Sequence, residues 1–213
     1  MDIELLSPKV SQYLDSLVPP REAEMQAMEE IAAKTNFPII GPASGYFCYL
    51  VARMIGAKRV FELGSGYGYS TAWFAKAVKE NGGGEVFHVV WDADLSKRAR
   101  KHLSVLGFEG LVTFREGEAV QTLRETEGPF DLIFNDIDKQ GYPASLDVIA
   151  SKLRPGGALI IDNMLWHGRI FDPADKSPAT EGVREFTRRI TRDPEWIAGL
   201  APLRDGLIVA MKK

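Results

Sequence analysis

The chain has 213 residues, of which 45% are hydrophobic and 26% charged, and its formal net charge at pH 7 is −3. This length suits one domain with a full core, so we expect residues 1–213 to form a single domain. The nearly balanced charge argues against broad binding to nucleic acid or to an anionic membrane. The single cysteine, Cys48, can form no intramolecular disulfide, and we see no signal peptide or membrane-spanning apolar run. We therefore expect a cytoplasmic protein.

The first part of the chain, residues 1–56, is expected to be mainly helical. Apolar residues recur at helical spacing over 8–34, and the pair Pro19-Pro20 divides this stretch into two helices. Two further prolines then favour an extended segment, because each disfavours helix in the residue before it. Ser44 is the expected N-cap of a third helix.

From residue 57 to 213, β-type and helical segments alternate. Such alternation predicts a parallel sheet that is covered by helices on both faces, which is a doubly wound α/β fold. The last two β segments lie too close in sequence for a helical crossover, so we expect them to pair antiparallel. The expected strands are 59–63, 85–90, 111–115, 130–135, 158–162, 196–200 and 206–212, and the expected helices are 70–80, 95–106, 118–125, 142–153 and 180–192.

Three glycines at alternate positions follow the first expected strand, in the sequence Phe-Glu-Leu-Gly-Ser-Gly-Tyr-Gly-Tyr-Ser over 61–70. Glycine lets a ligand approach the backbone closely, so this turn is typical of a nucleotide site. A dinucleotide fingerprint reads G-x-G-x-x-G, whereas this segment reads E-x-G-x-G-x-G with a carboxylate still on the strand. The carboxylate favours a cationic cofactor, and S-adenosylmethionine carries both a sulfonium and an ammonium. The predicted cofactor-binding residues of this segment are Glu62, Gly64, Ser65, Gly66, Gly68, Tyr69 and Ser70.

Polar residues also follow the second and third expected strands, at the edge where open α/β sheets bind ligands. Asp92 lies about 20 residues beyond the glycines, where an acidic side chain is expected to hold ribose hydroxyls. Asp94 is the alternative, but it suits the N-cap of the following helix better. Gly117 and Glu118 follow the third strand, and Glu118 either receives the adenine amino group or stabilises the start of its helix.

A second polar group follows the fourth and fifth expected strands. Asp136 comes after one and Asp162-Asn163 after the other, and adjacent strands lie about 4.8 Å apart, so these side chains can surround one ion. Oxygen ligands favour Mg²⁺ or Ca²⁺ over zinc. Taken singly, each of these residues could instead cap a helix or start a turn. Lys139 would lie close to the cation, whose charge favours the neutral amine that can serve as a base. Trp166 is either a wall for a flat apolar acceptor or part of the loop packing.

Five segments of the chain carry a resemblance to a known family. They are the glycine segment 61–70, Phe-Asp-Leu-Ile-Phe-Asn-Asp-Ile-Asp-Lys-Gln-Gly-Tyr (130–142), Leu-Arg-Pro-Gly-Gly (153–157), Ile-Asp-Asn-Met-Leu-Trp-His-Gly (161–168) and Arg-Asp-Gly-Leu (204–207). From about residue 21 to its C-terminus, the sequence resembles the cation-dependent class I O-methyltransferases that are related to catechol and caffeoyl-coenzyme A O-methyltransferases. The resemblance implies a Rossmann-like sheet of seven strands, mostly parallel with an antiparallel last strand.

The resemblance also implies roles for particular residues. Asp136, Asp162 and Asn163 would bind the metal, and Lys139 would be the catalytic base, with Asp136 also counted as catalytic and cofactor-binding. Ile40 and Gly41 would line the cofactor together with the glycine segment. Lys139, Asn163 and Trp166 would contact the substrate.

The expected reaction is therefore the transfer of a methyl group from S-adenosylmethionine to a hydroxyl of a vicinal-diol phenolic acceptor, catechol-like or hydroxycinnamoyl-like, with help from Mg²⁺ or Ca²⁺. The family also implies a homodimer. Two positions differ from the family pattern: Val90 stands where most members have an acidic residue, and Gly199 stands where the animal catechol enzymes have a carboxylate. The alternatives are a Rossmann oxidoreductase that uses NAD(P) and a protein that binds S-adenosylmethionine without catalysis.

Overall fold

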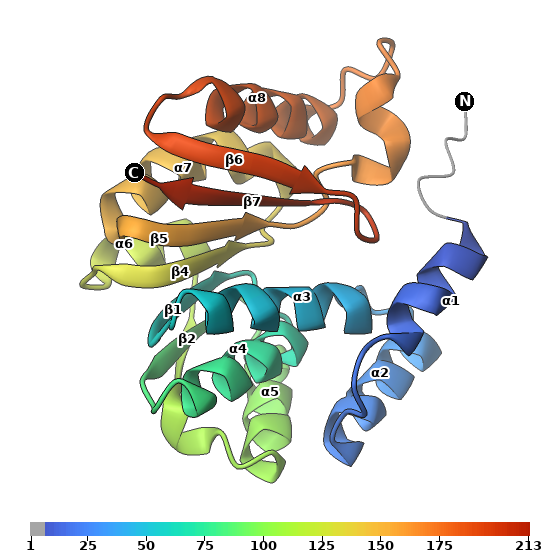
Figure 1. Ribbon diagram of the computed structural model, residues 1–213, viewed down its shortest axis with the longest axis vertical. Helices are drawn as coiled ribbons and strands as arrows, with labels where there is room; N and C mark the ends of the chain where they lie inside the picture. The colour runs from blue at the N-terminus through green and yellow to red at the C-terminus, as the bar shows by residue number, and fades with distance from the viewer. Residues whose placement is uncertain (1–6) are drawn as a thin grey trace.

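The computed structural model describes residues 7–213, so the first six residues of the predicted N-terminal segment lie outside the described part (Figure 1). Within 7–213, seven strands form one sheet in the order β3-β2-β1-β4-β5-β7-β6. Neighbouring strands from β3 to β5 pair in parallel, and β7 pairs antiparallel with both β5 and β6. The expected mostly parallel sheet with an antiparallel last strand is therefore confirmed.

The strands are β1 (Arg59–Leu63), β2 (Glu85–Val90), β3 (Val112–Glu116), β4 (Phe130–Asn135), β5 (Leu153–Ile161), β6 (Trp196–Ala201) and β7 (Leu207–Lys212). The α-helices of the described chain are α1 (Pro8–Ser16), α2 (Ala23–Thr35), α3 (Gly41–Met54), α4 (Tyr69–Glu80), α5 (Ala93–Val105), α6 (Ala119–Glu125), α7 (Tyr142–Lys152) and α8 (Pro178–Arg192). None of the helices within residues 7–213 combines the length and the apolar character needed to cross a membrane.

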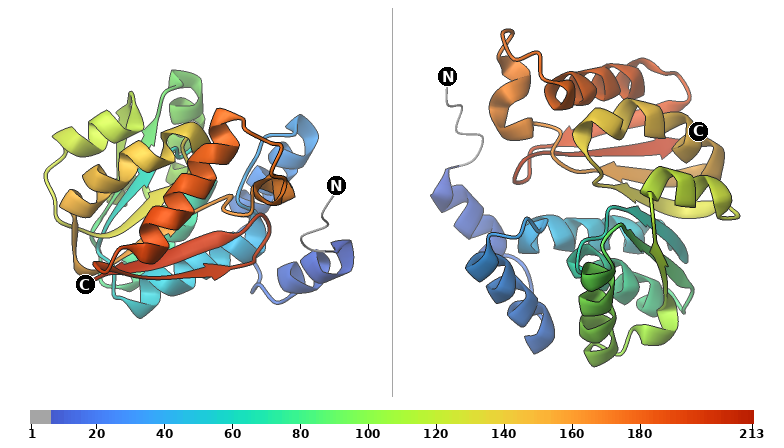
Figure 2. Two further views of the ribbon diagram at one scale, coloured as in Figure 1. Left: turned by 90° about the horizontal axis from the view of Figure 1, so that it is seen from above. Right: turned by 180° about the vertical axis from the view of Figure 1, so that it is seen from behind.

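Both faces of the sheet are covered by helices. Successive strand residues point to opposite faces, so Val60 packs in one core with α3, α4 and α5, and its neighbour Phe61 packs in a second core with α6, α7 and α8. Figure 1 views the molecule from the side of α3 and α4, and the right-hand view of Figure 2 shows it from the side of α6 and α7. The central strands are therefore buried on both faces, as expected for a parallel sheet, whereas the edge strands β3 and β6 are partly exposed.

Two local expectations need correction. Helix α3 begins at Gly41 rather than after an N-cap at Ser44, which is buried inside the helix. Pro42 fits the first turn, because the N–H that proline lacks would have no helical partner there. The turn expected before the fifth strand is instead a part of β5, which starts at Leu153 and pairs with β4 through an irregular register.

Candidate functional site

Two cavities open at the edge of the sheet where the parallel strands end, and they meet at Asp136. The glycine loop is the turn of residues 64–68 between β1 and α4. The glycine-loop cavity, of about 210 Å³, is lined by this loop and by residues 37–40. The strand-end cavity, of about 610 Å³, is lined by residues that follow β4 and β5. Pro38, Ile39 and Asp136 line both cavities. A ligand in one cavity would therefore lie next to a ligand in the other.

The glycine loop is held against the ends of two neighbouring strands. The Asp136 N–H donates a 2.8 Å hydrogen bond to the Leu63 carbonyl. Ser65 exchanges two 2.9 Å hydrogen bonds with Val89, one through its backbone N–H and one through its hydroxyl. Gly64 has φ +88°, and a Cβ at this position would lie 2.5 Å from the Asp136 carbonyl oxygen. A residue with a Cβ cannot adopt this backbone position unless the loop or Asp136 shifts. Glycine therefore allows the loop backbone, which forms the floor of the cavity, to pack directly against Asp136.

Glu62 is fully buried beneath this loop. Its Oε2 accepts a 2.5 Å hydrogen bond from Thr71 of α4, and its Oε1 has no hydrogen-bond partner within residues 7–213. Burial raises the pKa of Glu62 to about 7, although the hydroxyls of Ser70 and Thr71 oppose this rise. Glu62 does not line the glycine-loop cavity, so it is buried behind the residues that form the cavity wall.

The predicted cofactor-binding residues fall into two groups. The lining of the glycine-loop cavity includes Ile40, Gly64, Ser65, Gly66, Tyr69, Ser70 and Asp136. Six others do not line it, namely Gly41, Glu62, Gly68, Asp92, Gly117 and Glu118. Their roles in cofactor binding stay predictions.

Two of these outer residues cap helices. The N-cap of α5 is Asp92, which accepts hydrogen bonds from the N–H groups of Asp94 and Leu95, so our assignment of the cap to Asp94 is wrong. The helix begins earlier than its apolar spacing suggests, which moves the cap to the earlier carboxylate. Glu118 caps α6 in the same way. Either carboxylate can bind a ligand only with the oxygens or lone pairs that the cap leaves free.

Lys139 and Asp136 form an ion pair at the junction of the cavities. Lys139 Nζ lies 2.7 Å from Asp136 Oδ1 and 3.3 Å from the Ile137 carbonyl oxygen. The same ammonium faces the rings of Tyr142 and Trp166, with its nitrogen 5.3 and 5.9 Å from their centres. Two aromatic faces and a carboxylate thus fix the position of the amine and limit its contact with water.

Asp162 and Asn163 follow β5 and reach the strand-end cavity together. Asp162 is buried, and its Oδ2 accepts a 2.9 Å hydrogen bond from Arg204 Nη1. Burial and the nearby Asp136 carboxylate raise the pKa of Asp162 to about 6. The amide Nδ2 of Asn163 donates a 3.0 Å hydrogen bond to Asp205 Oδ2. The amide oxygen Oδ1 therefore remains available to coordinate a cation or to accept a hydrogen bond from a ligand.

The predicted metal residues fit a hard cation in their donor chemistry. Asp162 Oδ1 is buried and has no hydrogen-bond partner in the described chain, and an orphaned carboxylate oxygen of this kind suits a cation. Asp136 and Asn163 supply further oxygens. Within residues 7–213, no three His, Cys, Asp or Glu side chains are grouped to hold a metal, so the predicted set depends on the Asn163 amide.

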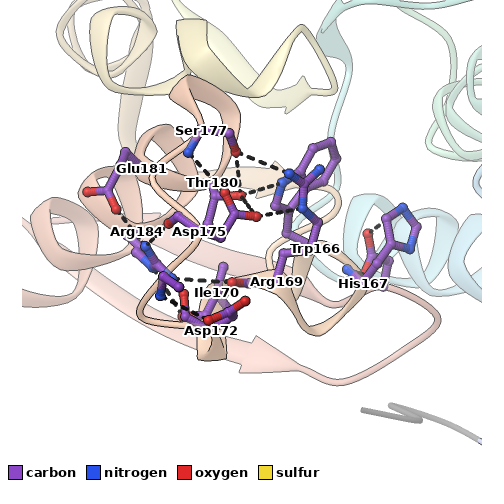
Figure 3. Close-up of polar contacts among 12 residues, drawn as sticks. Trp166, His167, Arg169, Ile170, Asp172, Asp175, Ser177, Thr180, Glu181 and Arg184 are labelled. Atoms are coloured by element: carbon purple, nitrogen blue, oxygen red, sulfur yellow. Dashed lines mark hydrogen bonds and ion pairs between the residues drawn. The ribbon is translucent and has the colours of Figure 1, made fainter. Parts of the chain in front are cut away.

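Trp166 is held in place by the first turn of α8 and by the loop that precedes it (Figure 3). Its indole N–H donates a 3.1 Å hydrogen bond to Thr180 Oγ1. Thr180 in turn donates a hydrogen bond to Asp175 Oδ2, which also accepts one from Arg169 Nε. His167 next to it has an exposed side chain, and its backbone N–H donates to Asp205 Oδ1 at 2.6 Å. Trp166 is therefore both packed in the loop and part of the cavity wall, which combines our two alternatives.

Arg204 and Asp205 have no predicted role, although both contact the predicted metal residues. They lie in the turn between β6 and β7. Because β7 is antiparallel to β5, its first residues lie at the edge where β5 ends, and Ile161 pairs with Ile208. An antiparallel strand beside β5 brings the turn before it to the end of β5. The expected antiparallel pairing of the last strand was therefore the signal that could have placed this turn at the site.

Comparisons with known proteins agree with this geometry. The sequence matches the family described as O-methyltransferase over residues 18–213. A catechol O-methyltransferase of Niastella koreensis is 32% identical over 183 residues, which cover 83% of this chain and 82% of that protein. Caffeoyl-CoA O-methyltransferase 2 of Zea mays is 32% identical over 192 residues, with 85% of this chain and 72% of that protein covered.

A solved structure has the same fold. The O-methyltransferase from Bacillus cereus, in complex with SAH, superposes with a TM-score of 0.86 at 29% sequence identity, and the match covers 96% of this chain and 97% of that one. These relatives support a methyl-transfer site and not the NAD(P)-dependent oxidoreductase that we held as an alternative. The chain therefore belongs to the O-methyltransferase family, and it is an S-adenosylmethionine-dependent methyltransferase of the group that includes catechol and caffeoyl-CoA enzymes.

Proposed function

We propose that the enzyme transfers the methyl group to a hydroxyl of a phenolic acceptor that carries two vicinal hydroxyls, with the assistance of a divalent cation, Mg²⁺ or Ca²⁺. The observation that carries this proposal is the meeting of the two cavities at Asp136, beside the amine of Lys139. A methyl donor on the glycine loop would lie next to an acceptor in the strand-end cavity. Such placement of donor and acceptor is the main source of acceleration in a direct displacement.

The relatives support the class of acceptor. Catechol and caffeoyl groups both carry two adjacent phenolic hydroxyls, and proteins named for these acceptors are 32% identical to this chain. The flat ring of such an acceptor suits a cavity with Trp166 in its wall.

Lys139 is the proposed base. A free phenol has a pKa of about 10, so only about one molecule in a thousand is ionised at pH 7. When bound, S-adenosylmethionine would supply an electrophilic methyl group, and the cation would stabilise the ionised hydroxyl. The neutral amine of Lys139 would take the hydroxyl proton, while Asp136 keeps the amine at the junction of the cavities.

Asp136, Asp162 and Asn163 are the proposed cation ligands. Each would contribute a side-chain oxygen, and Asp205 would fix the amide of Asn163 through the 3.0 Å hydrogen bond. Asp205 is thus a positioning residue. The homodimer implied by the resemblance and the cytoplasmic location expected from the composition also stay proposals, and light scattering of the purified enzyme tests the first.

Labelled methyl transfer tests the proposal. The enzyme is incubated with labelled S-adenosylmethionine and either catechol, a caffeoyl conjugate or phenol, in Mg²⁺ and in EDTA. We expect methylation of the two vicinal diols, loss of most of it in EDTA and recovery on adding Mg²⁺. Equal methylation of phenol would disprove the vicinal-diol requirement. Full activity of an Asp136→Ala enzyme in EDTA would disprove the metal role.

A further inference from the structure

The turn between β6 and β7 places a guanidinium on one of the proposed metal ligands. Arg204 Nη1 lies 2.9 Å from Asp162 Oδ2, and the two residues are 42 positions apart in sequence. Arg204 also lines the strand-end cavity. The hairpin turn and α1 lie on the same side of the molecule in Figures 1 and 2. The guanidinium therefore faces the space in which a cation would bind.

The backbone at Arg204 is unusual for a residue with a side chain. Its φ is +50°, and the turn is closed by a 2.8 Å hydrogen bond from the Gly206 N–H to the Leu203 carbonyl. Glycine adopts this left-handed conformation readily, whereas other residues rarely do. A strained position occupied by arginine, whose head group contacts a buried carboxylate, indicates that this side chain has a function of its own.

Each of the two carboxylates among the proposed metal ligands already has a cationic partner without a metal. Asp136 is paired with Lys139 at 2.7 Å, and Asp162 is paired with Arg204 at 2.9 Å. A divalent cation that binds to both carboxylates would approach two positive side chains. Since like charges repel strongly in a partly buried site, the ion must displace or weaken at least one of these pairs.

We propose that Arg204 is an internal competitor of the divalent cation: its guanidinium is paired with Asp162 Oδ2 when no metal is bound, and this pair must weaken or break before the cation can bind tightly to Asp162. This inference rests on the proposed metal-assisted function. It adds that the cation affinity of the enzyme is set by an exchange between a side chain and the ion.

The guanidinium is free enough to make this exchange. Within the described chain, its one hydrogen bond to a side chain is the bond to Asp162, and the pair is not bidentate. Arg204 also lines a second, smaller cavity of about 110 Å³ between α1 and α3, together with Asp15. A displaced guanidinium would therefore find space and another carboxylate beside it.

Binding of Mn²⁺ tests the proposal without any measurement of activity. The ligand-free protein is titrated with Mn²⁺, and the free ion is measured by electron paramagnetic resonance. The variants are Arg204→Gly, which suits the positive φ, and Arg204→Gln, which removes the charge but keeps the backbone strain. Arg188→Gln is the matched control, because Arg188 is a half-exposed arginine on α8 that pairs with Glu185. Circular dichroism and thermal unfolding establish that each variant is folded.

We expect both Arg204 variants to bind Mn²⁺ on the order of tenfold more tightly than the wild type, because a positive charge has left the site. Arg188→Gln should bind like the wild type, and adding Asp162→Asn to Arg204→Gln should remove the gain. If the Arg204 variants bind Mn²⁺ with unchanged or weaker affinity, Arg204 is not a competitor, although the cation site itself stands. If neither the wild type nor any variant binds Mn²⁺, both this inference and the metal part of the proposed function fail.

Discussion

Thr71 donates a 2.5 Å hydrogen bond from its hydroxyl to Glu62 Oε2, and this bond lies in the core beneath the glycine loop. The same hydroxyl lies 3.0 Å from His88 Nδ1. Since a hydroxyl has one proton and gives it to Glu62, it must accept from His88, whose Nδ1 then carries the proton. Burial lowers the pKa of His88 to about 3, so this imidazole is neutral at pH 7. Glu62 is therefore the titrating group of this buried set near neutral pH.

Replacing Glu62 with Gln should change how the stability of the ligand-free enzyme depends on pH. The folded-state pKa of Glu62, about 7, lies above the ordinary 4.5, so its contribution to stability is full below pH 4.5 and is lost as the pH rises through 7. Between pH 6 and 8 this loss amounts to about 1 kcal/mol of unfolding free energy in the wild type. The Glu62→Gln enzyme should show no such loss of unfolding free energy between pH 6 and 8, as measured by urea unfolding at both pH values. Glu116→Gln, at an exposed glutamate, is the control, and a Glu62→Gln curve parallel to the wild type would contradict the buried titration.

Replacing Lys139 with Ala should reduce turnover by about 10²- to 10⁴-fold, the usual contribution of a general base. Because Lys139 lines the strand-end cavity and not the glycine-loop cavity, the affinity for S-adenosylmethionine should stay within about twofold. Lys139→Arg is the informative companion, since it keeps a positive charge beside Asp136 but cannot accept a proton. Single-turnover kinetics measure the rate of methyl transfer, and calorimetry measures the affinity for S-adenosylmethionine. Wild-type turnover in Lys139→Arg would show that the residue acts by charge and not as a base.

Much of the fold could be predicted because its signals are local. The strand over 59–63, the glycines after it and the helix that follows were all placed from adjacent residues, and the structure confirms them. The alternation of such units then implied a parallel sheet. The cap of α5 was misplaced because Asp92 and Asp94 both suit a cap, and only the start of the helix decides between them.

The candidate site was predicted where its residues follow parallel strands, and missed where they do not. Asp136 and Asp162 were found by reading the ends of β4 and β5. Arg204 and Asp205 were not, because their place beside Asp162 and Asn163 depends on the register of β7 against β5. The contact of Trp166 with Thr180 depends on the conformation of an irregular loop, for which sequence offers no periodicity.

Replacing Thr180 with Val should weaken acceptor binding more than cofactor binding. The change removes the acceptor of the Trp166 indole N–H and breaks the link to Asp175 (Figure 3). A lost hydrogen bond is worth about 1 kcal/mol, so KM for the phenolic acceptor should rise about fivefold with a smaller change in kcat. Thr191→Val on the same helix is the control, since its hydroxyl bonds only within α8. An unchanged KM would mean that the loop holds Trp166 without Thr180.

Replacing Gly64 with Ala should destabilise the enzyme and weaken its binding of S-adenosylmethionine. Gly64 and Gly82 have nearly the same positive φ, +88° and +94°, so an added Cβ brings the same strain of about 1–2 kcal/mol at either position. At Gly82 the Cβ would meet no atom within 4 Å, whereas at Gly64 it would lie 2.5 Å from the Asp136 carbonyl oxygen.

The difference between Gly64→Ala and Gly82→Ala therefore isolates the close approach of the loop to β4. We expect it to add about 1–3 kcal/mol to the loss of unfolding free energy, the usual cost of overpacking. Because relief of the clash must move the loop or Asp136, Gly64→Ala should also lower cofactor affinity, whereas Gly82→Ala should not. Urea unfolding and calorimetry measure the two effects. Equal stability of the two variants would mean that the loop can rise from the strand ends at no cost, and that the floor of the cavity is not fixed by Gly64.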